Sequence, residues 1–190
     1  MAQWLDTALH GFDYAILAAI HDFAIATGGF FDWFMLAITS LANDGLGMIA
    51  LGLVLFCFKR TRKTGMAVLF AIAVGALITN VTLKPLVARI RPYDLQEELG
   101  VAIKLLIDAQ HDFSFPSGHT IASFEAATAI AIHNKKWGIP ALVLACLIAF
   151  SRLYLYVHYP TDVLASVVLG IGFAFLGSWM VKKGYEIAKK

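Results

Sequence analysis

Long apolar runs separated by short polar turns dominate the chain. Two of these runs, Gly65–Leu83 and Val163–Val181, carry no charged residue, and a third, Gly138–Val157, carries only Arg152. Each run is 19 or 20 residues long, and a helix needs about 20 apolar residues to cross the hydrocarbon core of a bilayer. The pattern therefore predicts three membrane-spanning helices.

Two further apolar runs are less regular. Phe34–Phe58 is long enough to cross but is interrupted by the polar residues Asn43–Gly45, which predicts a short helix followed by the true span. His119–His133 is shorter and contains Glu125, but the short loops on both sides leave it little option except to cross. These two runs bring the prediction to five spans.

The N-terminal segment is ambiguous. In the stretch from Leu5 to Ala26 the apolar residues are diluted by polar ones, among them His10, Asp13, His21 and Asp22. Such a segment either lies in the membrane interface or forms a sixth span, and we favour the sixth span. The sequence thus predicts an all-α fold: a polytopic membrane helix bundle of six helices, in a single domain that covers residues 1–190.

Composition strengthens the membrane prediction. Hydrophobic residues make up 59% of the 190 residues and charged residues only 15%, with a mean hydropathy of +0.74. A soluble domain is roughly 45–50% apolar and about 25% charged, so the excess apolar surface requires lipid as its solvent. The net charge of +2 is too small to indicate a nucleic-acid partner.

The positions of the basic residues predict the orientation of the spans. Ten of the fifteen Lys and Arg residues lie in three clusters, at residues 59–63, 135–136 and 182–190. When the five spans are threaded alternately, all three clusters lie on one side, which the excess of Lys and Arg in cytoplasmic loops identifies as the cytoplasm. The loop 84–116 and the turn 158–162 then face outside.

The first polar cluster on the outer side contains Lys84, Arg91 and Pro92. Lys84 and Arg91 are seven residues apart, so on a helix they would share a face two turns apart, and Pro92 would then end the helix. Two cations on one face suit a phosphate group. Arg89 would point elsewhere, toward lipid headgroups. Taken alone, this stretch is better explained as an ordinary basic cluster at the membrane edge.

The second cluster is Pro116–His119, directly before a predicted helix. Ser117 and Gly118 would expose backbone N–H groups at the helix start, where the helix dipole favours an anion. The absence of a side chain at Gly118 permits close approach, and His119 would lie beside a bound phosphate. An ordinary capped helix start with an incidental histidine explains this stretch equally well.

The third cluster contains Arg152, His158 and Asp162. An arginine inside an apolar run is costly unless it faces a polar site within the protein. His158 and Asp162 are four residues apart, close enough for the carboxylate to accept the imidazole N–H, which leaves the other ring nitrogen free to attack phosphorus. A structural His–Asp pair is the alternative, but it leaves Arg152 and the other two clusters unexplained.

Together the three clusters resemble the signature of the type-2 phosphatidic acid phosphatase family, whose fold is shared with vanadium haloperoxidases. The family pattern is Lys, six residues, Arg-Pro; then Pro-Ser-Gly-His; then Ser-Arg, five residues, His, three residues, Asp. The chain matches all three parts in order, between about residues 80 and 165. One part alone is a weak signal, but three parts that fall on one predicted membrane face are specific.

The resemblance implies a role for each matched residue. His158 would be the nucleophile that forms a phosphohistidine, and Asp162 would orient it. His119 would act as general acid toward the leaving oxygen and then as general base for water. The residues implied to bind the phosphoryl oxygens are Lys84, Arg91, Ser117, Gly118 and Arg152. No metal and no other cofactor is implied, and the acidic residues of the outer loop are too spread out to suggest a magnesium site.

The implied activity is hydrolysis of a phosphate monoester or diphosphate on a membrane lipid, at the outer face of a bacterial inner membrane. Undecaprenyl diphosphate is the substrate that we favour, with phosphatidylglycerophosphate and phosphatidate as alternatives. Membrane lipids are then the expected surroundings and the lipid phosphate the expected partner. A lipid or anion transporter is the rival of another class, although a transporter predicts repeated halves that the sequence lacks. An inactive family member is a third reading, but both histidines are present.

Overall fold

The structure is a computed structural model that describes residues 7–101 and 103–189. The described residues form helices and connecting loops, which confirms the predicted all-α fold. In chain order the helical elements are α2 (His10–Ala26), α3 (Asp32–Ser40), the 3-10 turn η1 (Asn43–Gly45), α4 (Leu46–Cys57), α5 (Arg62–Ile78), the π-helical segment η2 (Thr79–Leu83), α6 (Lys84–Val87), α7 (Pro92–Glu98), α8 (Gly118–His133), α9 (Lys135–Tyr154) and α10 (Pro160–Ile187).

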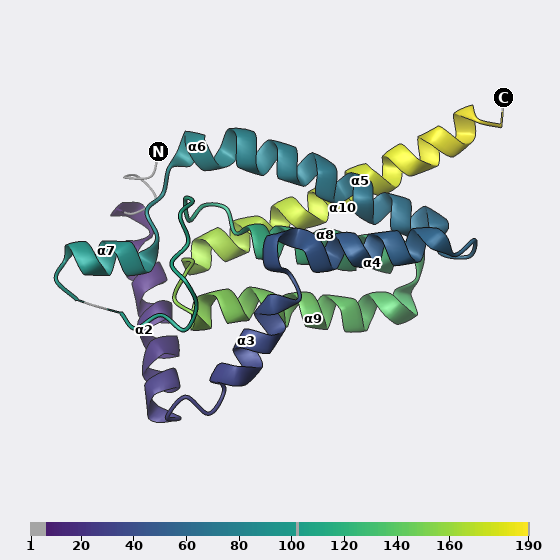
Figure 1. The fold of residues 1–190 in the computed structure, drawn as a ribbon. Coiled ribbons are helices and arrows are strands. Elements are labelled where there is room, and N and C mark those ends of the chain that lie inside the picture. Colours follow the sequence, from purple (N-terminus) through teal and green to yellow (C-terminus); the bar gives the residue numbers. More distant parts are fainter. Residues whose placement is uncertain (1–6, 102, 190) are drawn as a thin grey trace.

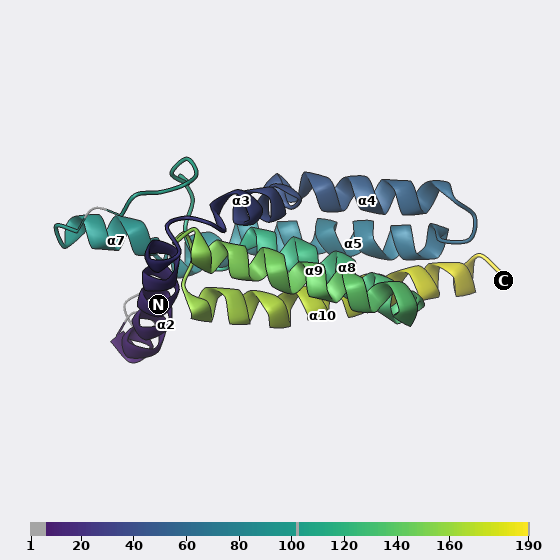
Figure 2. The ribbon, with the colours of Figure 1, turned by 90° about the horizontal axis from the view of Figure 1, so that it is seen from below.

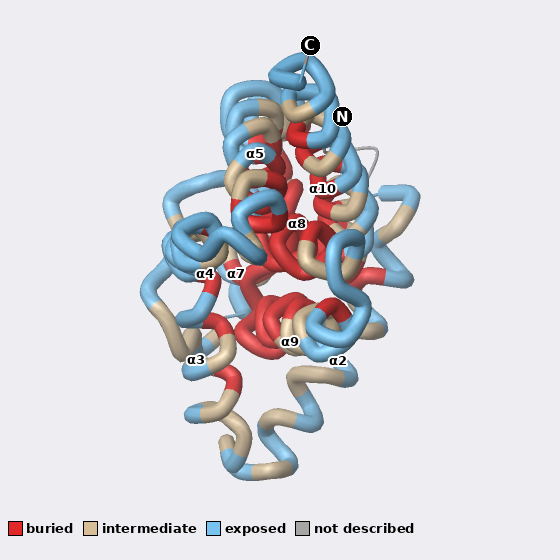
Figure 3. The backbone as a smooth tube through the Cα atoms, turned by 90° about the vertical axis from the view of Figure 1, so that its right-hand side faces the viewer, coloured by how far each residue is buried: buried red, intermediate tan, exposed pale blue. Residues whose placement is uncertain are grey.

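Helices α4, α5, α8, α9 and α10 run side by side and form a bundle (Figures 1 and 2). Helix α8 lies at its centre, in contact with α4, α5, α9 and α10. Every residue of α8 from Thr120 to Ala129 is buried, and this helix carries much of the buried backbone in Figure 3. Because α8 is surrounded by other helices, it tolerates polar residues that a lipid-facing helix would not.

Three of the five predicted spans are confirmed by length and composition: the segment that begins with α5, then α9, and α10. The other two predicted spans are present as shorter helices, with 12 residues in α4 and 16 in α8. At 1.5 Å of rise per residue, neither alone reaches across a core of about 30 Å. The predicted interruption at Asn43–Gly45 is observed as the turn η1, which separates α3 from α4.

The outside of the bundle is apolar. Large hydrophobic side chains on four of its helices have half or more of their surface exposed, among them Leu53, Leu77, Val143, Val168 and Phe175. An exposed apolar surface of this extent is unfavourable in water and favourable in lipid. The arrangement fits a multi-pass membrane protein, with α8 shielded inside and the other helices facing the bilayer.

Small residues let the helices approach closely. A Cβ atom added to Gly177 of α10 would lie 2.6 Å from the backbone oxygen of Ala67 in α5. A Cβ atom added to Gly65 of α5 would lie 2.6 Å from the backbone oxygen of Gly52 in α4. In lipid the hydrophobic effect does not drive helices together, so their association depends on close van der Waals packing. Membrane helices therefore commonly have glycine where they cross.

The two ends of the bundle differ. Helix α2 lies across one end rather than alongside the other helices (Figures 1 and 2). This placement matches the interfacial alternative rather than the favoured sixth span, and residues 5–6 of that predicted segment lie outside the described residues. At the opposite end lie the α4–α5 turn, the α8–α9 turn and the C-terminus (Figure 1), so the three basic clusters share one end, as predicted.

Candidate active site

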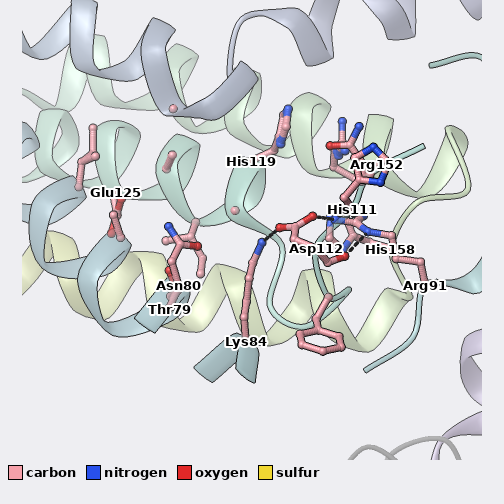
Figure 4. Close-up of a pocket in the computed structure, with 18 of the residues that line it drawn as sticks. Thr79, Asn80, Lys84, Arg91, His111, Asp112, His119, Glu125, Arg152 and His158 are labelled. Carbon is pink, nitrogen blue, oxygen red and sulfur yellow. Dashed lines mark hydrogen bonds and ion pairs between the residues drawn. The ribbon is translucent and has the colours of Figure 1, made fainter. Parts of the chain in front are cut away.

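A cavity of about 730 Å³ opens near the α2 end of the bundle, and all three sequence motifs contribute to its wall (Figure 4). The motif residues that line it are Lys84, Arg91, Gly118, His119, Arg152 and His158. Ser117 and Asp162 do not line the cavity and lie fully buried behind it. In the described part of the chain, no three His, Cys, Asp or Glu side chains are grouped to hold a metal ion.

The first motif is shaped by a sharp turn rather than by a helix. The helix that carries Lys84 ends at Val87, and Ala88 adopts a left-handed conformation with φ of 51°. Arg91 is extended, and Pro92 is the first residue of α7. The predictions that Lys84 and Arg91 share one helix face, and that Pro92 ends that helix, are therefore wrong. The left-handed residue at 88 redirects the chain, and proline is well suited to a first helical position because it needs no hydrogen-bonded N–H there.

Asp112 binds both cations of the first motif (Figure 4). Its Oδ1 accepts a hydrogen bond of 2.6 Å from NH2 of Arg91, its Oδ2 accepts one from Nζ of Lys84, and its backbone oxygen accepts one of 2.9 Å from Nε of Arg91. Burial raises the pKa of the Asp112 carboxyl, but the hydrogen bonds and charges of Lys84 and Arg91 outweigh burial and lower it to about 2. In the sequence Asp112 is one of several scattered acids of the outer loop, and no motif marks it as the partner of these two cations.

Arg89 is a buried residue of the site and does not face lipid headgroups, so that prediction is wrong. Its side chain is 1% exposed. Its NH2 lies 2.7 Å from Oδ2 of Asp13, and its NH1 lies 2.6 Å from Oδ1 of Asp162. A guanidinium is stable inside a protein when carboxylates pair with it, and Asp13 comes from the distant helix α2. Nothing in the local sequence around Arg89 indicates that partner.

His158 and Asp162 are linked through Ser114. The shortest distance between the two is 3.8 Å, from Nδ1 of His158 to Oδ2 of Asp162. The hydroxyl of Ser114 donates a 2.5 Å hydrogen bond to Oδ2 of Asp162 and lies 3.5 Å from Nδ1 of His158. The direct hydrogen bond expected from the spacing of four residues is thus replaced by a serine that bridges the two. Ser114 carries no signal in the sequence.

The second ring nitrogen of His158 faces the cations. Its Nε2 lies 3.4 Å from NH1 of Arg91, which also donates a 2.7 Å hydrogen bond to the backbone oxygen of Val157. Burial lowers the pKa of His158 well below its ordinary value, and the positive charges of Arg91, Arg152 and Lys84 add to this effect. The imidazole is therefore neutral near pH 7, which is the form that has a lone pair for attack on phosphorus.

His119 and Arg152 are held from the side of α3 and η1. Nε2 of His119 lies 3.1 Å from Oδ1 of Asn43. NH1 of Arg152 donates a 2.7 Å hydrogen bond to the hydroxyl of Thr39. The Arg152 side chain is 1% exposed, and its Nε has no hydrogen-bond partner within the described residues. Two hydrogen-bond partners of the site, Asn43 and Thr39, thus lie outside the sequence motifs.

Ser117 and Gly118 differ in how accessible they are. The backbone N–H of Ser117 donates to the hydroxyl of Ser166 at 2.8 Å, and its side-chain oxygen accepts a hydrogen bond of 3.0 Å from Thr120. Both groups of Ser117 are thus used within the protein. At Gly118 no atom lies within 4 Å of the position of an added Cβ, so the backbone there is open on the cavity side.

The cavity extends away from the histidines into the bundle. Its deeper wall contains Ile49, Ile72 and Ala76, together with Glu125. Within the described residues the Oε1 atom of Glu125 is buried and has no hydrogen-bond partner. The cavity therefore combines a cationic outer part with an inner part in which apolar side chains stand beside the polar residues Thr79, Asn80 and Glu125.

Comparison with known proteins indicates the family that the three motifs resemble. Residues 64–186 match the model of the PAP2 superfamily. Over 168 residues the chain is 32% identical to undecaprenyl-diphosphatase BcrC of Bacillus subtilis, a match that covers 86% of this chain and 81% of that protein. It is also 32% identical to an undecaprenyl-diphosphatase of Sulfolobus acidocaldarius, over 64% of this chain and 57% of the length of that relative.

Two solved structures share the fold. The crystal structure of Aquifex aeolicus LpxE has a TM-score of 0.74 and 26% sequence identity, over 87% of this chain and 94% of that chain. That of the transmembrane PAP2-type phosphatidylglycerolphosphate phosphatase from Bacillus subtilis has a TM-score of 0.62 and 27% identity, over 98% of both chains. The family match spans more than half of the chain and includes every motif residue that lines the cavity, so the chain belongs to the PAP2 superfamily.

Proposed function

We propose that this protein is a lipid phosphatase that removes the terminal phosphate from a membrane lipid phosphate or diphosphate through a phosphohistidine at His158. The observation that carries this proposal is the shape of the cavity. Three cations and three histidines surround its outer part, while apolar side chains of α4 and α5 line its inner part beside the polar residues Thr79, Asn80 and Glu125. Such a cavity suits a molecule with an anionic head and a hydrocarbon tail.

The first chemical step is transfer of the phosphoryl group to the enzyme. Lys84, Arg91 and Arg152 bind the phosphoryl oxygens and stabilise the charge that develops in the transition state. Nε2 of His158 attacks phosphorus, so that a nitrogen–phosphorus bond forms as the bond from phosphorus to the leaving oxygen breaks. His119 donates a proton to that oxygen, and the lipid product leaves.

The second step is hydrolysis of the phosphohistidine. His119, now deprotonated, accepts a proton from a water molecule whose oxygen attacks phosphorus. The nitrogen–phosphorus bond breaks, and inorganic phosphate is released. Ser114 and Asp162 hold Nδ1 of His158 throughout, which keeps Nε2 directed at the substrate. No step requires a redox cofactor.

We propose undecaprenyl diphosphate as the substrate, acted on at the extracytoplasmic face. The names of the relatives from Bacillus subtilis and Sulfolobus acidocaldarius support this choice. The position of the cavity, at the end of the bundle opposite the basic clusters, supports the outward orientation. Phosphatidylglycerophosphate and phosphatidate are the alternatives, and the former appears in the name of one structural neighbour.

Phosphate release by the purified protein in detergent with EDTA tests the proposal. The three lipids are assayed in parallel with wild-type protein, a His158→Ala variant, and His133→Ala as the matched control at the far end of α8. We expect release that survives EDTA, is unchanged in the control, and falls by more than about 1,000-fold in His158→Ala, as loss of a nucleophile does.

The ranking of kcat/KM among the three lipids identifies the substrate. No phosphate release from any of them by folded wild-type protein would overturn the proposed activity, and a lipid or anion transporter would then be the function to test. If phosphate release persists in His158→Ala, the proposed phosphatase activity would stand but the phosphohistidine at His158 would be ruled out.

A further inference from the structure

A buried network of charged side chains connects the N-terminal helix to the segment that carries His158. The guanidinium of Arg89 bridges two carboxylates, with NH2 2.7 Å from Oδ2 of Asp13 and NH1 2.6 Å from Oδ1 of Asp162. Asp13 lies on α2, Arg89 in the turn after α6, and Asp162 in the first turn of α10. All three side chains are at most 1% exposed.

Asp13 also binds the start of α10 directly. Its Oδ1 accepts a 2.9 Å hydrogen bond from the backbone N–H of Thr161, and its Oδ2 accepts one of 2.7 Å from the Thr161 hydroxyl. NH1 of Arg89 lies 2.9 Å from the same hydroxyl, and its guanidinium carbon lies 3.8 Å from the centre of the Tyr159 ring. Helix α2 and the turn after α6 thus hold three of the four positions that follow His158, namely Tyr159, Thr161 and Asp162.

The network continues from Asp162 to the nucleophile. Oδ1 of Asp162 is bound by Arg89, while Oδ2 accepts hydrogen bonds from Ser114 at 2.5 Å and from the backbone N–H of Tyr159 at 3.1 Å. Both carboxylate oxygens are therefore fixed. The Ser114 hydroxyl lies 3.5 Å from Nδ1 of His158, so a shift of the Asp162 carboxylate would also shift the group that orients the imidazole ring.

We propose that Asp13 and Arg89 are positioning residues for the reaction, and that α2 is a functional part of the active site. Neither residue belongs to the three motifs, and Asp13 lies outside residues 64–186 that match the family model. One arginine suits this role because its planar fork binds two carboxylates at once, which a lysine cannot do. The inference rests on the proposed phosphatase reaction with His158 as nucleophile.

The variants Arg89→Lys and Asp13→Asn test this role, with Arg62→Lys and Asp22→Asn as matched controls at exposed positions. For each, kcat, KM and inhibition by inorganic phosphate are measured on the lipid that wild-type protein hydrolyses fastest. Size-exclusion chromatography in the same detergent gives the folded fraction of each preparation, to which kcat is normalised. Thermal unfolding in the same detergent reports folding.

We expect normalised kcat to fall by at least about tenfold in both test variants, because a small misplacement of a reacting group costs up to about a hundredfold. KM and phosphate inhibition should change less than about threefold, since the cations of the cavity are untouched, and both controls should match wild type. A purely structural role would instead lower the folded fraction and leave normalised kcat unchanged, which would overturn the inference.

If Arg89→Lys or Asp13→Asn fails to fold, a milder substitution at Thr161 tests the same contacts. Thr161→Val keeps the shape of the side chain and removes only the hydroxyl that contacts both Asp13 and Arg89. It should lower normalised kcat by about threefold or more, and wild-type kcat in this variant would overturn the inference. Failure of the proposed function is distinguishable, because it would appear as an inactive wild-type protein.

Discussion

Among single residues, Asp112 has the most direct bearing on substrate binding. Its carboxylate binds Lys84 and Arg91, the two cations of the first motif. A substrate phosphate therefore competes with this carboxylate for the same donors. Because the pKa of Asp112 is lowered to about 2, the carboxylate remains charged at every pH at which the protein would be assayed. The charge that Asp112 contributes to this competition should thus not change above about pH 4.

Replacement of Asp112 by Asn should strengthen phosphate binding. The amide is uncharged, so Lys84 and Arg91 would bind a phosphate without first losing an anionic partner. We expect the inhibition constant of inorganic phosphate to fall several-fold, with a parallel fall in KM for the lipid. Glu98→Gln, at an exposed position of the same outer region, is the control. A higher inhibition constant in the Asp112 variant would instead mean that the carboxylate organises the two cations.

The acid side of the pH–rate profile should report the lowered pKa of His158. Burial and the nearby cations hold this pKa well below the ordinary value of about 6.5. Protonation of the nucleophile in the free enzyme should therefore reduce kcat/KM only at pH values well below about 6.5. Because the unfolded state takes up this proton first, the free energy of unfolding should fall as the pH drops below about 6.5.

The measurement is kcat/KM between pH 4.5 and 8, with circular dichroism at each pH to show that the protein stays folded. An apparent pKa at or above about 6.5 on the acid side, in folded protein, would contradict the prediction.

The sequence predicts the residues that line the site better than the residues that support them. The three motifs together, through their resemblance to a family signature, identify Lys84, His119 and His158 as candidates, and the structure brings them to one cavity. The supporting contacts join residues far apart in the chain, such as Ser114 to Asp162 and Arg89 to Asp13. Local patterns carry no information about such pairs, so the prediction that Arg89 faces lipid headgroups is wrong.

At the scale of elements, the bundle depends on glycines where helices cross. Gly177 of α10 packs against α5, where an added Cβ would lie 2.6 Å from the Ala67 oxygen and 2.8 Å from the Ala71 nitrogen. Gly172 of the same helix has no atom within 4 Å of that position. Two glycines five residues apart on one helix thus meet very different surroundings.

We expect Gly177→Ala to destabilise the protein and Gly172→Ala to leave it unchanged or slightly more stable. Overpacking of a tight contact costs about 1–3 kcal/mol, whereas alanine in place of an unhindered helical glycine contributes up to about 1 kcal/mol. Thermal unfolding in detergent should show a lower midpoint for Gly177→Ala only. Equal midpoints for the two variants would show that α5 and α10 have room to separate.

Hydrophobic pattern predicts the elements unevenly. The uncharged runs of α5 and α10 are predicted correctly as spans, because an uncharged apolar helix of about 20 residues is stable mainly inside a membrane. The end of α6 at Val87 is not predicted, because Ala88 adopts a left-handed conformation that normally favours glycine or asparagine. The position of α2 depends on the contacts of Asp13 with other parts of the chain, which its own composition does not reveal.

At the scale of the whole molecule, the two ends of the bundle carry different properties. The basic clusters gather at one end and the cavity opens near the other. Since Lys and Arg are retained on the cytoplasmic side, this polarity sets the orientation that we propose. The reaction would then take place on lipid at the outer surface.

Labelling with a membrane-impermeant thiol reagent tests the orientation. In a background with Cys57 and Cys146 replaced by Ser, a cysteine at Leu99 should be labelled in intact cells. A cysteine at Lys136 should be labelled only after the membrane is opened. Leu99 is 66% exposed after α7, and Lys136 lies in the α8–α9 region at the basic end. The reverse pattern would place the active site on the cytoplasmic side.

The central position of α8 also has a consequence for how the protein is made. Helix α8 contains Glu125 and is covered by other helices over most of its length, so it would insert poorly into a membrane by itself. Only Asn134 separates it from α9, which is long and apolar enough to cross. We therefore expect the two helices to enter the bilayer together as one hairpin, so that during biosynthesis the helix that carries His119 depends on its successor.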